Sequence, residues 1–128
     1  MTENEIAREV VDAAYKVHTT LGPGLLESVY EIVLAHELTR RGLAVTRQTA
    51  IPIKYESIVF DEGFRADIVV EGKVILELKS VESVAAVHKK QLLTYLRLAD
   101  MQLGLLINFG EELLKTGITR VVNGLIEE

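Results

Sequence analysis

Residues 64–80 read FRADIVVEGKVILELKS, a stretch that sets three ionisable side chains, Asp67, Glu77 and Lys79, among apolar ones. Its apolar, β-branched runs predict two strands. Residues 71–73 (EGK) predict a turn between them, because glycine readily adopts a positive φ. This turn would fold the first strand back against the second, and we therefore expect Asp67 to lie close to Glu77.

The chemistry of these three side chains favours a metal site. Side chains alternate along a strand, so Glu77 and Lys79 share one face while Leu78 points into the core. Two adjacent carboxylates raise each other's pKa, whereas a hard cation such as Mg²⁺ stabilises both as anions. On this stretch alone, a solvated ion pair on a strand surface is an equally good interpretation.

Composition narrows the class of protein. The chain has 128 residues, 48% of them hydrophobic, no cysteine and a formal net charge of -5. These values predict one domain over residues 1–128, with no disulfide and no thiolate metal site. The N-terminus lacks the pattern of a signal peptide and no apolar run is long enough for a membrane span, so we expect a cytoplasmic protein with no membrane contact. The acidic balance argues against strong non-specific binding to nucleic acid.

Hydrophobic periodicity predicts an α/β fold. Helices are expected over residues 4–20, from near Leu25 to Gly42, and over 84–100. Beyond the two strands above, we expect strands over 43–55, where Pro52 indicates an edge or a bulge, and over 103–109 and 118–122. The order ααβββαβ(β) predicts a mixed central sheet flanked by helices, with a right-handed crossover through the last helix. The expected core contacts of the second and third helices are Leu26, Val29, Val33, Leu34, Leu38, Val84, Val87, Leu92, Leu96 and Ala99.

Four motifs now align with a known family. They are GLLESVY at 24–30, RAD at 65–67, ELK at 77–79 and QLLTY at 91–95. In this order, the chain from Ile6 to Val122 resembles the small GxxExxY proteins of the PD-(D/E)xK nuclease superfamily, with a QxxxY motif like that of RecB-type nucleases. The resemblance implies a restriction-endonuclease-like domain. The proline of the superfamily name is replaced here by Ala66, at a position that tolerates change.

The resemblance also implies roles for the motif residues. Asp67, Glu77 and the Leu78 carbonyl would bind Mg²⁺ or Mn²⁺, and Glu27 would hold a second ion or a water. Lys79 would position and activate the water that attacks a phosphodiester. DNA is the expected substrate, because members of the superfamily mostly cut DNA.

Two helical pairs would complete the site. Glu27 and Tyr30 are three residues apart, and Gln91 and Tyr95 four apart, so each pair shares a helix face. Gln91 would orient Lys79 or hold a phosphate, and Tyr95 would contact the substrate backbone. Taken singly, Glu27 and Tyr30 are also explained as a first-turn acid and a core tyrosine, and Gln91 and Tyr95 are better explained as interfacial helix residues.

Weaker candidates would contact the substrate. They are Tyr30 on its helix, Arg65 next to the second motif as a counter-ion to the acids or a phosphate contact, and the basic run His88, Lys89 and Lys90. A catalytically silent nuclease fold acting as a binding or regulatory module, and a hydrolase of a smaller phosphorylated compound, stay open as alternatives. A homodimer or a protein partner would supply target choice that this acidic chain lacks.

Overall fold

A computed structural model of the chain describes residues 1–125. Its elements are α1 (Glu3–Leu21), α2 (Glu27–Arg40), β1 (Val45–Tyr55), β2 (Ile58–Val70), β3 (Val74–Lys79), α3 (Ala86–Ala99), β4 (Leu103–Asn108), the 3₁₀ helix η1 (Leu114–Thr116) and β5 (Ile118–Val122). The predicted order of helices and strands is therefore confirmed. The short helix η1 was not predicted.

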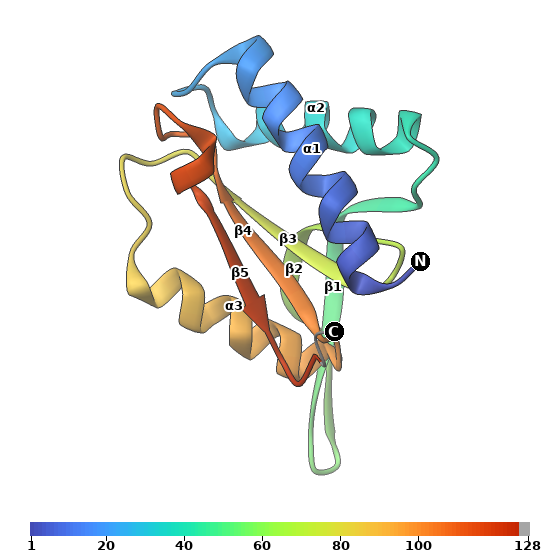
Figure 1. The fold of residues 1–128 in the computed structure, drawn as a ribbon. Helices are drawn as coiled ribbons and strands as arrows, with labels where there is room; N and C mark the ends of the chain where they lie inside the picture. Colours follow the sequence, from blue (N-terminus) through green and yellow to red (C-terminus); the bar gives the residue numbers. More distant parts are fainter. Residues whose placement is uncertain (126–128) are drawn as a thin grey trace.

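The five strands form one mixed sheet in the order β1-β2-β3-β4-β5. Only β3 and β4 are parallel, and α3 makes the connection between them. Helices α1 and α2 cover one face of the sheet and α3 covers the other (Figure 1). This is the expected sheet flanked by helices, and it matches a restriction-endonuclease-like fold.

Alternation along the strands builds a core on each face of the sheet. Leu76 and Leu78 of β3 pack toward α1 and α2, whereas Ile75 packs toward Leu92 and Leu96 of α3. All residues of β4 are buried, as expected for a strand covered on both faces. By the same alternation, Glu77 and Lys79 lie on the face of β3 that is turned toward α3.

Local signals explain where the elements begin and end. Helix α1 starts with a capping box between Thr2 and Glu5. The predicted turn at residues 71–73 is present, with Gly72 at a φ of 62°. Pro52 lies on the edge strand β1, where the register with β2 shifts between Ile51 and Ile53, so the predicted edge or bulge is confirmed on both counts.

Three of the predicted core contacts are wrong. Leu26 is 74% exposed, Val87 is 63% exposed and Val29 also lies at the surface. Each lies within two residues of the start of its helix. Among residues 1–125, none of the helices has both the length and the apolar character that crossing a bilayer requires.

Candidate active site

The two carboxylates meet where β2 and β3 separate. Ladder pairing between these strands ends at Ile68 and Leu76. One residue further along each strand, the Asp67 N–H donates to Glu77 Oε1 at 3.4 Å, and Asp67 Oδ2 accepts a hydrogen bond from the Leu78 N–H at 2.9 Å. Side-chain oxygens thus replace the carbonyl partners of a regular ladder. The expected proximity of Asp67 and Glu77 is confirmed.

This arrangement disfavours two simultaneous negative charges. Burial, together with the negative charge of Asp67, raises the pKa of Glu77 to about 8, and the nearby Lys79 ammonium offsets only part of this rise. Without a cation, the carboxyl of Glu77 therefore holds a proton at neutral pH. A bound divalent ion would take the place of that proton.

The α2 side of the site is a pocket of about 370 Å³. Its lining residues are Glu27, Ser28, Glu31, Arg47, Gln48, Asp67 and Leu78. Glu27 is exposed at the start of α2 and lines this pocket together with Asp67 and Leu78. Within residues 1–125, the structure contains no group of three Asp, Glu, His or Cys side chains that could hold a metal ion. Glu27 thus lies on the wall of the pocket and does not join the carboxylate pair as a third close ligand.

A buried carboxylate that was not predicted from the sequence organises that pocket. Glu31 is 6% exposed and accepts hydrogen bonds from Arg47 Nε at 3.1 Å, from Arg47 Nη2 at 2.9 Å and from Gln48 Nε2 at 2.6 Å. The ion pair fixes a guanidinium at the pocket wall. Glu31 follows Glu27 by four residues on the same helix face, which is the one signal that could have indicated it.

Gln48 links this pocket to the carboxylate pair. Its φ is 48°, and it interrupts the β1–β2 register at the position opposite Asp67, between the pairs Arg47 with Ile68 and Thr49 with Ala66. From there its Nε2 lies 3.5 Å from Asp67 Oδ1. A regular strand would not bring this amide between Glu31 and Asp67, so sequence periodicity could not predict it.

Helix α3 brings Tyr95 toward the carboxylates from the other face of the sheet. Burial and the charges of Glu77 and Asp67 raise the pKa of Tyr95. Its ring stacks on Phe64 of β2, with centroids 3.9 Å apart and planes inclined by 6°. Gln91 is exposed one turn earlier on the same helix. The half-buried Lys79 shares the strand face of Glu77, and its carbonyl accepts a hydrogen bond from the Phe109 N–H at 2.8 Å.

Tyr30 has a structural position that differs from the expected one. Tyr30 is fully buried, and its ring stacks on that of Phe109 with the centroids 4.4 Å apart. Its hydroxyl donates to the Gly22 carbonyl and accepts a hydrogen bond from the Leu25 N–H at 3.1 Å. Both bonds hold the loop before α2, in which Gly24 has a φ of 92°. The expectation that Tyr30 contacts substrate is therefore corrected: the side chain is inaccessible and shapes the loop that positions Glu27.

Replacing Tyr30 by Phe tests this structural role. Phenylalanine keeps the stacking on Phe109 but leaves two backbone groups of the loop without their partner, so the free energy of unfolding should fall by about 1–3 kcal/mol. Urea denaturation measures the change. Tyr15→Phe, on a tyrosine that is 39% exposed, is the matched control and should leave stability near that of the wild type. Equal stability of both variants would contradict the assignment.

The weaker candidates lie in different parts of the molecule and have different partners. Arg65 forms an ion pair with Glu62 at 2.7 Å and donates to the Gln48 carbonyl at 3.2 Å, so the acid that it pairs with is Glu62 and not the expected Asp67 or Glu77. His88 Nδ1 accepts the Ala85 N–H at 3.2 Å and caps α3.

The two lysines after His88 differ in their surroundings. Lys89 lines a separate pocket of about 200 Å³ with Glu111 and Thr116, and Lys90 is exposed on α3. Neither lines the pocket that contains Asp67. Of the basic residues, only Arg47 is among the residues that line it.

The donor set at the carboxylate pair fits a hard divalent cation. Two carboxylates and the neighbouring backbone carbonyl of Leu78 offer oxygen atoms, which Mg²⁺ and Mn²⁺ prefer over nitrogen or sulfur. The pKa of Glu77, raised by burial and by the charge of Asp67, agrees with this fit, because a bound cation would stabilise the ionised carboxylate. The residues present therefore fit such an ion.

The mixed five-stranded sheet and the paired carboxylates at its separating strands define a restriction-endonuclease-like protein. Residues 4–121 match the family model described as the PD-(D/E)XK nuclease superfamily, and the chain belongs to this superfamily. Its members are in general nucleases that depend on divalent metals. A search of curated proteins and a search of solved structures each found no match. Membership in the GxxExxY subfamily stays a prediction.

Proposed function

We propose that the protein is a Mg²⁺- or Mn²⁺-dependent nuclease that hydrolyses phosphodiester bonds, with DNA as its substrate. The observation that carries this proposal is the Asp67–Glu77 pair, where the pKa of a buried carboxyl rises to about 8 beside a lysine on the same strand face. A structural ion pair would not bring two carboxylates together. The match to the nuclease superfamily supports the same reading.

Asp67, Glu77 and the carbonyl of Leu78 would hold the ion. When bound, the ion supplies Lewis-acid polarisation of the phosphate and neutralises the charge of the two carboxylates. The hydrogen bond from the Leu78 N–H fixes the Asp67 carboxylate at one oxygen, and Gln48 approaches the other. These contacts orient the carboxylate before substrate arrives, so that little reorganisation is required in the reaction.

Lys79 would act on the water and on the phosphate. Its ammonium is near enough to Glu77 to lower the pKa of that carboxyl in part, which supports a position at the reacting centre. From there it would orient the attacking water and stabilise the negative charge that develops on the phosphate oxygens. We assign Glu27 to a water or a second ion at the pocket wall, and Gln91 and Tyr95 to the substrate side of α3.

Arg47 would bind a phosphate next to the scissile one. Glu31 holds Nε and Nη2 of this guanidinium, whose side chain stays 43% exposed beside the site. Arginine that is pre-oriented in this way recognises phosphate at little entropic cost. It also explains how a chain of net charge -5 would bind a polyanion. The net charge of the chain repels phosphate, whereas a guanidinium fixed at the site attracts it locally.

Arg47→Ala should therefore weaken substrate binding more than chemistry. We expect KM for DNA cleavage to rise roughly tenfold with a smaller fall in kcat, and the salt dependence of binding to become shallower, because one charged phosphate contact is lost. Arg40→Ala is the matched control, since Arg40 is 63% exposed and outside the pocket lining. An unchanged KM in a variant that melts normally would refute this role of Arg47.

The substrate class is tested by a panel of linear, circular and single-stranded DNA, of RNA, and of small phosphodiesters. We expect metal-dependent cleavage of DNA, with no product from Glu77→Ala on the same substrates. Hydrolysis of the small phosphodiesters alone would favour the alternative that the protein is a hydrolase of a smaller phosphorylated compound. DNA binding without cleavage at any metal concentration would favour a catalytically silent binding module.

A further inference from the structure

Helix α2 begins without the side-chain cap that usually fixes the start of a helix. Its N-cap residue is Leu26, which makes no side-chain hydrogen bond. Serine, threonine, aspartate or asparagine is preferred at this position, because a side-chain oxygen there accepts one of the free backbone N–H groups. Glu27 is the first residue of α2. The position of Glu27 therefore depends on other contacts of residues 22–26, which we call the α2 loop.

Two hydroxyl groups hold the α2 loop at Leu25. The Leu25 N–H donates to the hydroxyl of Tyr30 at 3.1 Å, and the Leu25 carbonyl accepts a hydrogen bond from the hydroxyl of Ser80 at 2.5 Å. Tyr30 belongs to α2 itself, whereas Ser80 lies 55 positions further along the chain than Leu25 and directly follows Lys79. Figure 1 shows the α2 loop and the connection after β3 at the same end of the molecule. The bond of Ser80 thus joins the α2 loop to the strand that carries Lys79.

The sheet holds Ser80 in place. Strand alternation continues from Leu76 and Leu78, which pack toward α1 and α2, to Ser80 on the same side. The next residue, Val81, has both backbone groups bonded to the side chain of Asn108: its N–H donates to Oδ1 at 3.0 Å and its carbonyl accepts from Nδ2 at 2.9 Å. Asn108 is fully buried at the end of β4. Ser80 is therefore a donor in a fixed place next to the α2 loop.

Loss of this bond would change the position of the loop more than the stability of the fold. The bond lies at the surface, so water can replace the hydroxyl of Ser80 as the donor to the Leu25 carbonyl. Glu27 lines the pocket beside Asp67, so a small shift of the α2 loop moves its carboxylate relative to the Asp67–Glu77 pair. Misplacement by about 1 Å can lower a rate by about 100-fold.

We infer that Ser80 is a positioning residue for Glu27. Its hydrogen bond to the α2 loop sets where the Glu27 carboxylate lies relative to Asp67 and Glu77. The inference rests on the proposed function, in which Glu27 holds a water or a second ion at the pocket wall. One strand, β3, then supplies Glu77 and Lys79 to the reaction, and the residue that follows it fixes the acid that α2 contributes.

Ser80→Ala should lower kcat for DNA cleavage about tenfold and leave KM within about twofold of the wild-type value. The melting temperature and the affinity for the first Mn²⁺ should stay near those of the wild type. Ser80→Thr keeps the hydroxyl and should restore kcat. A residue that only stabilised the fold would instead lower the melting temperature and leave kcat of the folded protein unchanged.

Combination with Glu27→Gln tests whether Ser80 acts through Glu27. In the Glu27→Gln protein, adding Ser80→Ala should lower kcat no further, because the carboxylate that depends on the bond is already gone. Two losses that multiply would overturn the inference, since Ser80 would then act on another group.

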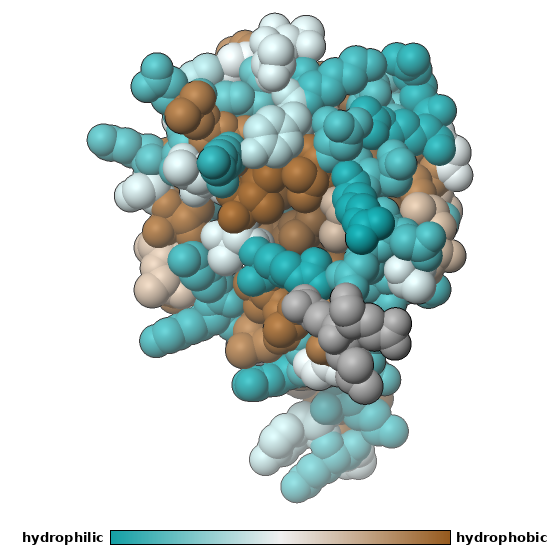
Figure 2. All heavy atoms as spheres, in the orientation of Figure 1, coloured by the Kyte–Doolittle hydropathy of each residue, from teal (hydrophilic) through white to brown (hydrophobic). Residues whose placement is uncertain are grey.

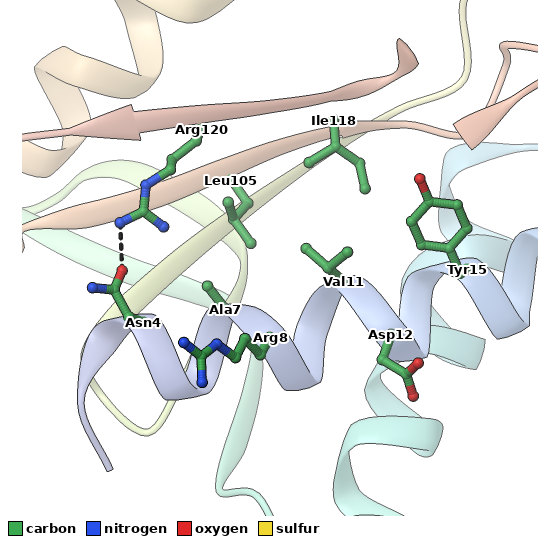
Figure 3. Close-up of a pocket in the computed structure, with 9 residues that line it drawn as sticks. All are labelled: Asn4, Ala7, Arg8, Val11, Asp12, Tyr15, Leu105, Ile118 and Arg120. Carbon is green, nitrogen blue, oxygen red and sulfur yellow. Dashed lines mark hydrogen bonds between the residues drawn. The ribbon is translucent and has the colours of Figure 1, made fainter. Parts of the chain in front are cut away.

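Asn4→Ala is the matched control. A hollow of about 730 Å³ lies between α1 and the strands β4 and β5, where apolar atoms gather at the surface (Figure 2). Within residues 1–125, its lining residues all differ from those of the pocket beside Asp67. At one end of this hollow, Asn4 accepts a hydrogen bond from Arg120 (Figure 3). Asn4→Ala thus also removes a side-chain hydrogen bond between distant residues, and it should leave kcat unchanged.

Amide hydrogen exchange measured by NMR tests the bond without a substrate. In Ser80→Ala the Leu25 N–H should exchange several-fold faster than in the wild type, because the α2 loop opens more often. In Ser80→Thr and Asn4→Ala it should exchange at the wild-type rate. Unchanged exchange in Ser80→Ala would overturn the inference.

The two readouts separate this inference from the proposed function. If the wild type cleaves DNA and Ser80→Ala has the wild-type kcat, the inference is overturned and the nuclease activity stands. If the wild type cleaves no DNA while the Leu25 N–H exchanges faster in Ser80→Ala, the proposed function is overturned and the hold of Ser80 on the α2 loop is supported.

Discussion

Lys79→Ala should abolish DNA cleavage while the protein stays folded and still binds Mn²⁺. Removing the ammonium takes away the group that orients the water and stabilises charge on the phosphate, and loss of one such electrostatic group lowers kcat by roughly 10²–10³-fold. The side chain is only half-buried, and the Leu78 and Asp67 contacts use backbone and carboxylate atoms, so the sheet does not depend on it.

The matched control is Lys73→Ala at the turn between β2 and β3. Lys73 is an exposed lysine at the opposite end of β3, where its ammonium donates to the Met1 carbonyl at 2.7 Å. This variant removes the same charge from the chain and should cleave at the rate of the wild type. If Lys79→Ala also cleaves at that rate, Lys79 is no catalytic residue and the proposed centre is wrong.

Glu77→Gln should have two opposite effects: the metal-free protein becomes more stable at high pH, and Mn²⁺ binding is lost. The folded-state pKa of Glu77 is raised from 4.5 to about 8. A carboxyl with a raised pKa contributes stability that is fully present below the unfolded pKa and is lost as pH rises through the folded pKa. Above pH 8 the wild type therefore holds a buried charge that glutamine avoids, which costs on the order of 2–5 kcal/mol.

Denaturation at several pH values and calorimetry with Mn²⁺ measure the two effects. The variant should gain stability over the wild type progressively between pH 4.5 and 8, and the gain should stay constant above that range. Glu82→Gln removes an equal charge from an exposed position and should show neither effect. A Glu77→Gln protein that binds Mn²⁺ as the wild type does would remove this carboxylate from the metal site.

The backbone of the site was predictable because it rests on local signals. Gly72 sets the turn that places Asp67 beside Glu77, and strand alternation puts Glu77 and Lys79 on one face. The bulge near Pro52 follows from the missing backbone donor of proline. Each of these inferences needs only neighbouring residues, so a single sequence carries enough information.

The parts that were not predicted depend on contacts between distant residues. Glu31 binds Arg47, sixteen positions later, and Gln48 reaches Asp67 only because its φ is positive. The hydroxyl of Tyr30 is engaged by its own loop, which a helix-face argument cannot anticipate. Periodicity gives a side chain's face, whereas burial and partners at the ends of helices and strands follow from the tertiary fold.

The most direct test of the account is a time course of supercoiled DNA with purified protein and Mn²⁺ or Mg²⁺. The proposed metal-dependent cleavage predicts nicked or linear product that accumulates with time, requires the metal, stops when a chelator is added, and is absent with Lys79→Ala. Intact DNA with folded wild-type protein in both metals, or cleavage that continues in the chelator or with Lys79→Ala, would contradict it.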